Sequence, residues 1–174
     1  MYELHFSTGE EVRYPRAMQP KAYVETSVIS YLTARPSRDA LASGHQELTR
    51  QWWEHRRSRF ELYVSELVVQ EAGRGDPAAA RARLDMIAEY PVLRISPVAR
   101  SLADSILRRA VLPSKAAADA LHIALAAVNG MAFLLTWNCT HIANGFVLQS
   151  VNALCRAAGF DPPIVCTPEE LMEG

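Results

Sequence analysis

The stretch KAYVETSVISYLTA, residues 21–34, decides the fold class of this chain. Its apolar run at 22–25 predicts a buried β-strand, and the residues from 27 to 34 predict a helix that follows without a linker. We expect Thr26 to cap that helix, because threonine hydroxyls accept hydrogen bonds from free backbone N–H groups at helix starts. A strand that passes directly into a helix is the repeating unit of α/β domains.

The same alternation continues along the chain. Further strands are predicted at 60–65, 92–95, 132–136 and 164–166, and helices at about 39–59, 66–73, 77–90, 97–109, 115–129 and 146–158. Helix caps are expected at Ser65, Asp76 and Ser96. Because the predicted strands are apolar without interruption, we expect helices on both faces of the sheet. The fold class is therefore α/β, a three-layer α/β/α sandwich with a central parallel sheet.

Length and composition indicate one globular domain. The chain has 174 residues, of which 49% are hydrophobic, and patterning begins at residue 21. We therefore predict a domain over 21–174 and an N-terminal extension over 1–20, which is either a short arm or the result of start-site choice, with Met18 as the initiator. The formal net charge of −1 excludes a generally cationic coat for nucleic acids.

The cysteines and the apolar runs indicate a cytoplasmic protein. Cys139, Cys155 and Cys166 are odd in number and widely spaced, which argues against a disulfide framework and against a thiolate zinc site. No apolar run has the length of a membrane span, and the first residues lack the apolar stretch of a signal peptide.

Three acidic residues stand where a packed α/β domain gains no solubility from them. Glu25 ends the first predicted strand, at the carboxyl edge of the sheet. Glu71 lies near the end of a predicted helix, where the helix dipole disfavours a carboxylate, whereas Glu66 has an ordinary first-turn position. Asp119 lies in AAADALHIALAAV, residues 116–128, where His122 is the only other polar residue. A helix so apolar is buried, and a buried carboxylate needs a partner or a cation.

A polar cluster follows the fourth predicted strand. In LLTWNCTHIAN, residues 134–144, the polar side chains are Thr136, Asn138, Thr140 and His141, with Asn144 at the end. Turn chemistry alone accounts for asparagine and threonine here. Carboxylates from separate segments at one edge of a sheet suit a hard divalent cation such as Mg²⁺ or Mn²⁺, which activates water and neutralises phosphodiester charge.

Four segments in this order resemble a PIN domain, and most closely the VapC-type toxins of bacterial toxin–antitoxin pairs. They are YVETSVISYL (23–32), VSELVVQEAGRG (64–75), AAADALHIALA (116–126) and LLTWNCTHIAN (134–144). The resemblance covers about residues 21–174. It implies a metal-dependent endoribonuclease that leaves 5′-phosphate and 3′-hydroxyl ends, a cognate antitoxin as partner, and a homodimer as a further assembly.

The resemblance also implies roles for individual residues. Glu25, Glu71, Asp119 and Asn138 match the catalytic set, with Glu25 and Asp119 as metal ligands and Glu71 at a second ion or the attacking water. Supporting roles fall to Thr26, Thr136 and His122. The chain departs from the family at two positions, since the first acid is usually aspartate and Asn138 is neutral. The lower charge favours one tightly bound metal over two.

Arginines on the predicted helix at 39–59 are candidate RNA contacts. They are Arg50, Arg56, Arg57 and Arg59, and Trp52 and Trp53 between them would offer a stacking surface. The same pattern fits an amphipathic helix with its tryptophans in the core and its arginines in water, or a surface for dimerisation or antitoxin docking.

Two other functions remain open. One is a catalytically inactive PIN-fold module that binds RNA or protein, which the substituted first and fourth positions motivate. The other is a metal-dependent phosphatase, but such enzymes pair the acid after the first strand with another two residues on, and position 27 is a serine. His122 and His141 lack the H-E-x-x-H spacing or the thiolates of zinc sites, and we expect them to be hydrogen-bonded histidines near the site and not metal ligands.

Overall fold

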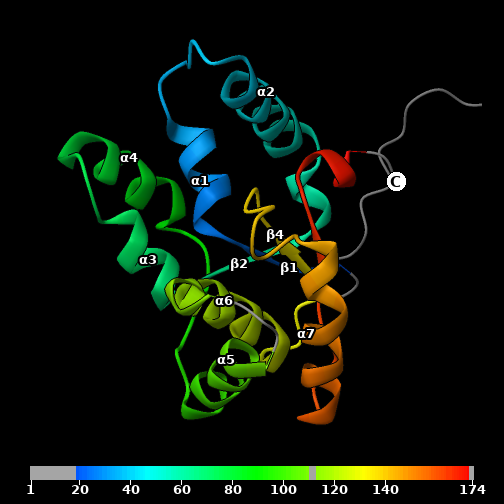
Figure 1. Ribbon diagram of the computed structural model, residues 1–174. Coiled ribbons are helices and arrows are strands. Elements are labelled where there is room, and N and C mark those ends of the chain that lie inside the picture. Colours follow the sequence, from blue (N-terminus) through cyan, green and yellow to red (C-terminus); the bar gives the residue numbers. More distant parts are fainter. Residues whose placement is uncertain (1–18, 110–112, 173–174) are drawn as a thin grey trace, which may run out of the picture.

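The computed structural model describes residues 19–109 and 113–172, and its centre is a five-stranded sheet in which every strand pairing is parallel. The strand order is β3-β2-β1-β4-β5 (Figure 1). The strands are β1 (Lys21–Val24), β2 (Glu61–Ser65), β3 (Val92–Leu93), β4 (Phe133–Leu135) and β5 (Ile164–Cys166).

Helices cover both faces of this sheet and form two groups that pack within themselves. The first group is α1 (Thr26–Thr33), α2 (Ala40–His55), α3 (Glu66–Ala72) and α4 (Pro77–Ile87). The second group is α5 (Pro97–Arg109), α6 (Ala117–Val128) and α7 (Gly145–Ala157). In Figure 1, α1 and α2 lie above the sheet and α5 to α7 lie below it. The predicted three-layer α/β/α sandwich with a parallel sheet is confirmed.

The direction in which successive strands are added to the sheet reverses between β1 and β4. From β1 it proceeds to β2 and β3 on one side, and then crosses to β4 and β5 on the other. Since crossovers between parallel strands are right-handed, the helices after β1 and after β4 leave toward opposite faces. The carboxyl ends of these two strands therefore flank the crevice where open α/β sheets bind ligands.

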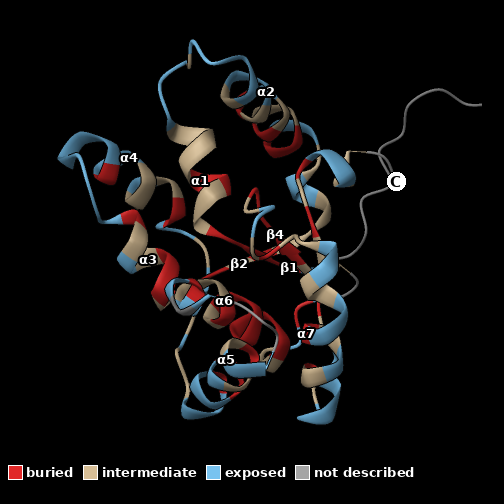
Figure 2. Ribbon diagram, in the orientation of Figure 1, coloured by how far each residue is buried: buried red, intermediate tan, exposed pale blue. Residues whose placement is uncertain are grey.

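The core lies between the layers, as the apolar strands predicted. Tyr23, Val24, Leu134 and Leu135 are at most 1% exposed. Helix α6 is buried almost throughout, with Ala120, Ile123, Ala124, Leu125 and Ala126 shielded from solvent (Figure 2). A carboxylate or imidazole on such a helix is removed from bulk water unless it faces the crevice.

Several element boundaries follow the predicted caps and others differ. Ser65, Asp76 and Ser96 accept hydrogen bonds from backbone N–H groups at the starts of their helices, as expected. The prediction that Thr26 caps α1 is wrong. Glu25 is the cap, because its side-chain carboxylate accepts a hydrogen bond from the N–H of Ser27 in the first turn of α1.

The helix expected at 39–59 is shorter than predicted. It ends at His55 and is followed by a separate turn, η2 (Arg57–Arg59). Two other short turns are η3 (Ser114–Ala116) and η4 (Glu169–Leu171). The predicted N-terminal extension lies outside the described residues, apart from Gln19 and Pro20. Among the described residues, no helix combines the length and apolarity that a membrane span requires.

Candidate metal centre

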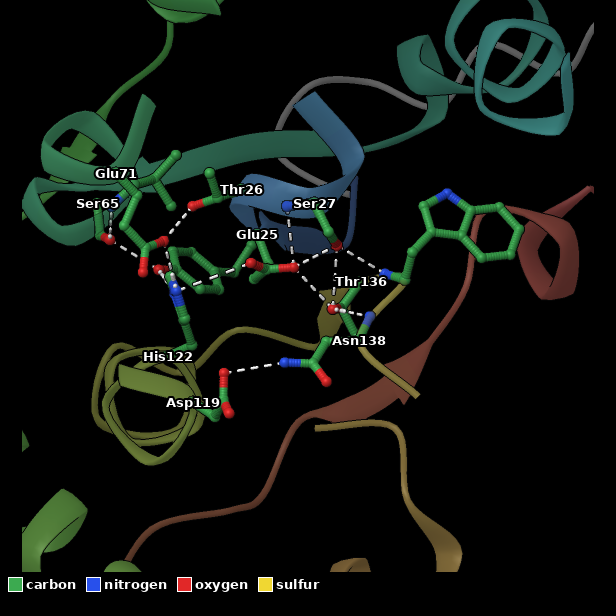
Figure 3. A network of polar contacts seen from close by, with 12 residues as sticks. Glu25, Thr26, Ser27, Ser65, Glu71, Asp119, His122, Thr136 and Asn138 are labelled. Atoms are coloured by element: carbon green, nitrogen blue, oxygen red, sulfur yellow. Dashed lines mark hydrogen bonds and ion pairs between the residues drawn. The ribbon is translucent and has the colours of Figure 1, made fainter. Parts of the chain in front are cut away.

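Glu25 and Thr136 lie side by side at the carboxyl ends of β1 and β4. The strands pair Val24 with Leu135, and the N–H of Glu25 donates to the carbonyl of Leu135 at 3.0 Å. This register places the next residue of each strand at the crevice, where the Thr136 hydroxyl donates to Oε2 of Glu25 at 2.8 Å (Figure 3). Strand pairing thus positions the first predicted acid.

The Glu25 carboxylate is buried and its two oxygens have different surroundings. Glu25 is 6% exposed. Oε2 accepts hydrogen bonds from the backbone N–H of Ser27 at 3.1 Å, from the Ser27 hydroxyl and from Thr136. Oε1 faces Nε2 of His122 at 3.8 Å. One oxygen is therefore anchored by dipoles, and the other points toward the ring of His122.

Glu71 reaches the same place from α3. Its Oε2 accepts a hydrogen bond from the Thr26 hydroxyl and lies 3.0 Å from Nε2 of His122, with 20% of the side chain exposed. Burial by itself would raise the pKa of Glu71, but the hydrogen bonds from His122 and Thr26 outweigh it and hold the pKa below the ordinary glutamate value. The carboxylate is therefore ionised at neutral pH.

His122 connects Glu71 to the floor of the crevice. It is 1% exposed, and its Nδ1 lies 2.7 Å from the hydroxyl of Tyr23, which lies 2.7 Å from the hydroxyl of Ser65. Burial raises the pKa of Tyr23 well above its ordinary value, so the phenol stays protonated. Ser65, Tyr23, His122 and Glu71 form a continuous hydrogen-bonded chain, which we call the Ser65–Glu71 chain.

Asp119 occupies α6 one turn before His122 and has partners of its own. Its Oδ1 accepts from the side-chain amide of Asn138 at 2.9 Å, and its Oδ2 lies 2.9 Å from Nδ1 of His141. The side-chain oxygen of Asn138 also accepts from the N–H of His141 at 3.2 Å. The loop after β4 is thus folded against Asp119, which remains 18% exposed.

Asn138 connects the residues around Asp119 with the residues around Glu25. Its backbone N–H donates to the Thr136 hydroxyl at 2.9 Å, and that hydroxyl in turn donates to Glu25. Figure 3 shows Asp119 and Asn138 together below His122 and Glu25, whereas Glu71 lies above His122, so that Asp119 is in the network but outside the group of candidate ligand atoms formed by Glu25, Glu71 and His122. The predicted site residues from four separate segments therefore meet in one network.

The acidic residues of this network pair with histidines and not with lysine or arginine among the described residues. Glu25, Glu71 and His122 each offer a ligand atom, and these atoms lie within 4.8 Å of one another. None of the ion pairs between described residues joins Glu25, Glu71 or Asp119 to a lysine or arginine. Arg74 acts on Glu71 only from beyond ion-pair distance. Buried and half-buried carboxylates without a lysine or arginine partner fit a divalent cation, so the residues present suit the expected metal.

The candidate RNA contacts lie elsewhere. Arg57 and Arg59 directly precede β2, at the amino edge of the sheet and opposite the crevice. Arg50 pairs with Glu47 at 2.9 Å, and Arg57 donates to the carbonyl of Trp53 at 3.0 Å. Trp52 and Trp53 are buried, so the stacking surface expected of them is wrong and the core interpretation is right. RNA contacts by Arg50, Arg56, Arg57 and Arg59 stay a prediction.

Three residues of the network were not singled out from the sequence as parts of the site. The Ser27 hydroxyl donates to Glu25, the Tyr23 hydroxyl bonds to His122, and Ser65 serves both as helix cap and as a partner of Tyr23. A tyrosine in a buried strand needs a hydrogen-bond partner, which is the signal that would have pointed to Tyr23. Glu66 stays outside the network and accepts from the N–H of Ile95 at 2.8 Å.

Comparison with known proteins assigns the family. The family model described as the PIN domain matches residues 22–138. The chain belongs to the PIN domain family. The matched range contains Glu25, Glu71, Asp119 and Asn138. A search of curated proteins found no match.

Two solved structures are similar to this chain at low sequence identity. The crystal structure of VapC20 from Mycobacterium tuberculosis, described as a toxin that cleaves the sarcin–ricin loop, is similar with a TM-score of 0.54 and 21% identity, over 73% of this chain and 97% of that one. VapBC2 from Rickettsia felis, bound to a DNA fragment from its promoter, has a TM-score of 0.47 and 11% identity, over 84% and 97% of the two chains.

Proposed function

We propose that this PIN domain is a Mg²⁺- or Mn²⁺-dependent endoribonuclease. The observation that carries the proposal is the meeting of Glu25 and Glu71 at the sheet's crevice, with Asp119 on the adjoining turn of α6 and no lysine or arginine paired to them among the described residues. Such a charge arrangement costs stability unless it serves a cation. Membership of a family of metal-dependent nucleases supports the same conclusion.

Glu25 and Glu71 would hold the ion, and Asp119 would position it directly or through a water; the ion when bound supplies charge neutralisation at a phosphodiester and a more acidic water. Thr26, Ser27 and Thr136 orient the carboxylates by donating hydrogen bonds to them. Asn138 fixes Asp119 through its amide. Cleavage with 5′-phosphate and 3′-hydroxyl ends is expected.

We propose further that the enzyme is the toxin of a type II toxin–antitoxin pair, acts in the cytoplasm and is held inactive by a cognate antitoxin. The fold that it shares with a toxin described as cleaving the sarcin–ricin loop favours this role over general RNA turnover. If so, expression of the chain alone should arrest growth, and a small protein from the adjacent reading frame should relieve the arrest.

The decisive experiment is RNA cleavage by the purified chain with Mg²⁺, with Mn²⁺ and with EDTA. We expect cleavage that requires metal, and its loss in Asp119→Asn, which removes one charge but keeps a side chain of the same shape. The matched control is Asp104→Asn on exposed α5, which should cleave as the unmodified chain does. Cleavage that persists in EDTA or in Asp119→Asn contradicts the proposal.

The alternative, an inactive PIN-fold binding module, is favoured by the anchoring of Glu25 through three hydrogen bonds to a single oxygen. It makes the opposite prediction. RNA would bind equally well in EDTA and with Mn²⁺ and would not be cut, and titration with Mn²⁺ would show no saturable site.

A further inference from the structure

The placement of His122 beside two carboxylates is not explained by core packing alone. It is a buried imidazole on α6, and its Nε2 faces two carboxylates at once, 3.0 Å from Oε2 of Glu71 and 3.8 Å from Oε1 of Glu25. We propose that Nε2 of His122 is a metal ligand beside Glu25 and Glu71, and that this nitrogen makes the centre prefer Mn²⁺ to Mg²⁺. The inference rests on the metal site of the proposed function and specifies its chemistry.

The spacing of the three donors fits a single ion. Donor atoms about 2.1 Å from an ion, in neighbouring positions around it, lie about 3 Å from one another. The distance of 3.0 Å from Nε2 of His122 to Glu71 matches this value, the distance of 3.8 Å to Glu25 is longer, and all three atoms lie within 4.8 Å of one another. Movements of the side chains by less than about 1 Å would therefore bring all three to bonding distance.

The far side of the imidazole is held as ligating histidines usually are. Such a histidine donates its second ring N–H to a fixed acceptor, which sets the tautomer and the orientation of the ring. Here Nδ1 lies 2.7 Å from the Tyr23 hydroxyl, and Tyr23 lies 2.7 Å from Ser65. Tyr23 can accept from Nδ1–H while it donates to Ser65, which leaves the lone pair of Nε2 free for an ion.

The imidazole of His122 can also satisfy its hydrogen-bonding partners when no metal ion is bound. Without an ion, Nε2–H donates to Glu71 and Nδ1 accepts from Tyr23, with the Ser65 hydroxyl donating to Tyr23. The two states of the Ser65–Glu71 chain differ in the direction of its hydrogen bonds and need no change in the charge of His122. Tyr23, which burial keeps protonated, is suited to both directions because a phenol donates and accepts.

A nitrogen donor changes which metal is favoured. Mg²⁺ is a hard ion that binds oxygen and keeps most of its waters, whereas imidazole suits first-row transition metals. A site of carboxylates alone would discriminate little between Mn²⁺ and Mg²⁺. The competing interpretation is that His122 only links Glu71 to Tyr23 as part of the core, in which case its loss would alter folding but not the choice of metal.

Electron paramagnetic resonance of Mn²⁺ bound to the RNA-free chain separates these interpretations. We expect coupling of the Mn²⁺ electron spin to a ¹⁴N nucleus, and Mn²⁺ binding at least about tenfold tighter than Mg²⁺ in competition titrations. His122→Gln should lose the ¹⁴N coupling and reduce the Mn²⁺/Mg²⁺ affinity ratio by about tenfold or more. The matched control, His141→Gln, replaces the other histidine of the network and should keep the coupling.

The outcomes are distinct. Saturable Mn²⁺ binding without ¹⁴N coupling overturns the inference and leaves the metal site of the proposed function standing, as does an unchanged metal preference in His122→Gln. Absence of saturable binding overturns both. ¹⁴N coupling in a chain that fails to cleave RNA supports the inference and contradicts only the nuclease. The spectrum of the unmodified chain decides the point even if His122→Gln does not fold.

Discussion

The side-chain amide of Asn138 donates a hydrogen bond of 2.9 Å to Oδ1 of Asp119. Asn138→Asp would replace this donor by a like charge. We expect a loss of about 1–3 kcal/mol in the free energy of unfolding in EDTA, and a larger stabilisation by Mn²⁺ than in the unmodified chain. Chemical denaturation with EDTA and with Mn²⁺ measures both effects.

A control for that variant lies in the same loop. Asn144 caps α7 by accepting from the N–H of Phe146 at 3.0 Å, a role that aspartate fills equally well. Asn144→Asp keeps this cap but loses the exposed hydrogen bond from the Asn144 amide to the carbonyl of Thr140, so it should change stability by no more than about 1 kcal/mol and by the same amount in EDTA and in Mn²⁺. Equal behaviour of the two variants would show that Asp119 and Asn138 do not share a cation-dependent charge balance.

The Ser65–Glu71 chain predicts a specific cost for removing one hydroxyl. Tyr23→Phe keeps the buried ring but leaves Nδ1 of His122 and the hydroxyl of Ser65 without their partner. Such buried polar groups cost about 1–3 kcal/mol, so urea denaturation should show a loss of that size. Tyr63→Phe is the matched control, because its hydroxyl bonds to Glu61 at a half-buried position. A cost no larger than that of the control would contradict the prediction.

Local patterns predicted the layers of this fold but not the order of its strands. The apolar runs of β1 and β4 showed burial on both faces, and Ser65, Asp76 and Ser96 marked helix starts by accepting hydrogen bonds from N–H groups only three residues away. The reversal of direction between β1 and β4 depends on contacts between residues more than a hundred positions apart. No local periodicity reports it.

The acids of the site were recognisable because their surroundings made them costly. Asp119 stood out in an apolar helix, and Glu71 near the unfavourable end of another. The hydroxyls that hold Glu25 and His122 were less visible, since Ser27 and Tyr23 have ordinary places in a helix and a strand. Trp52 and Trp53 illustrate the opposite difficulty, because large aromatic residues suit both a stacking surface and a core, and only packing decides.

The depressed pKa of Glu71 predicts how stability depends on pH without metal. A carboxylate with a lower pKa in the folded than in the unfolded state stabilises the fold above its unfolded pKa, near 4.3, and this contribution disappears as pH falls through the folded pKa. Glu71→Gln lacks the titration. The unmodified chain should therefore exceed Glu71→Gln in free energy of unfolding by more at neutral pH than at about pH 3.

Thr26→Val, which removes one hydrogen bond that lowers this pKa, should show a weaker pH dependence than the unmodified chain. Urea denaturation in EDTA over this range measures the difference, and a gap that widens as the solution becomes more acidic would show that Glu71 is not held ionised by His122 and Thr26.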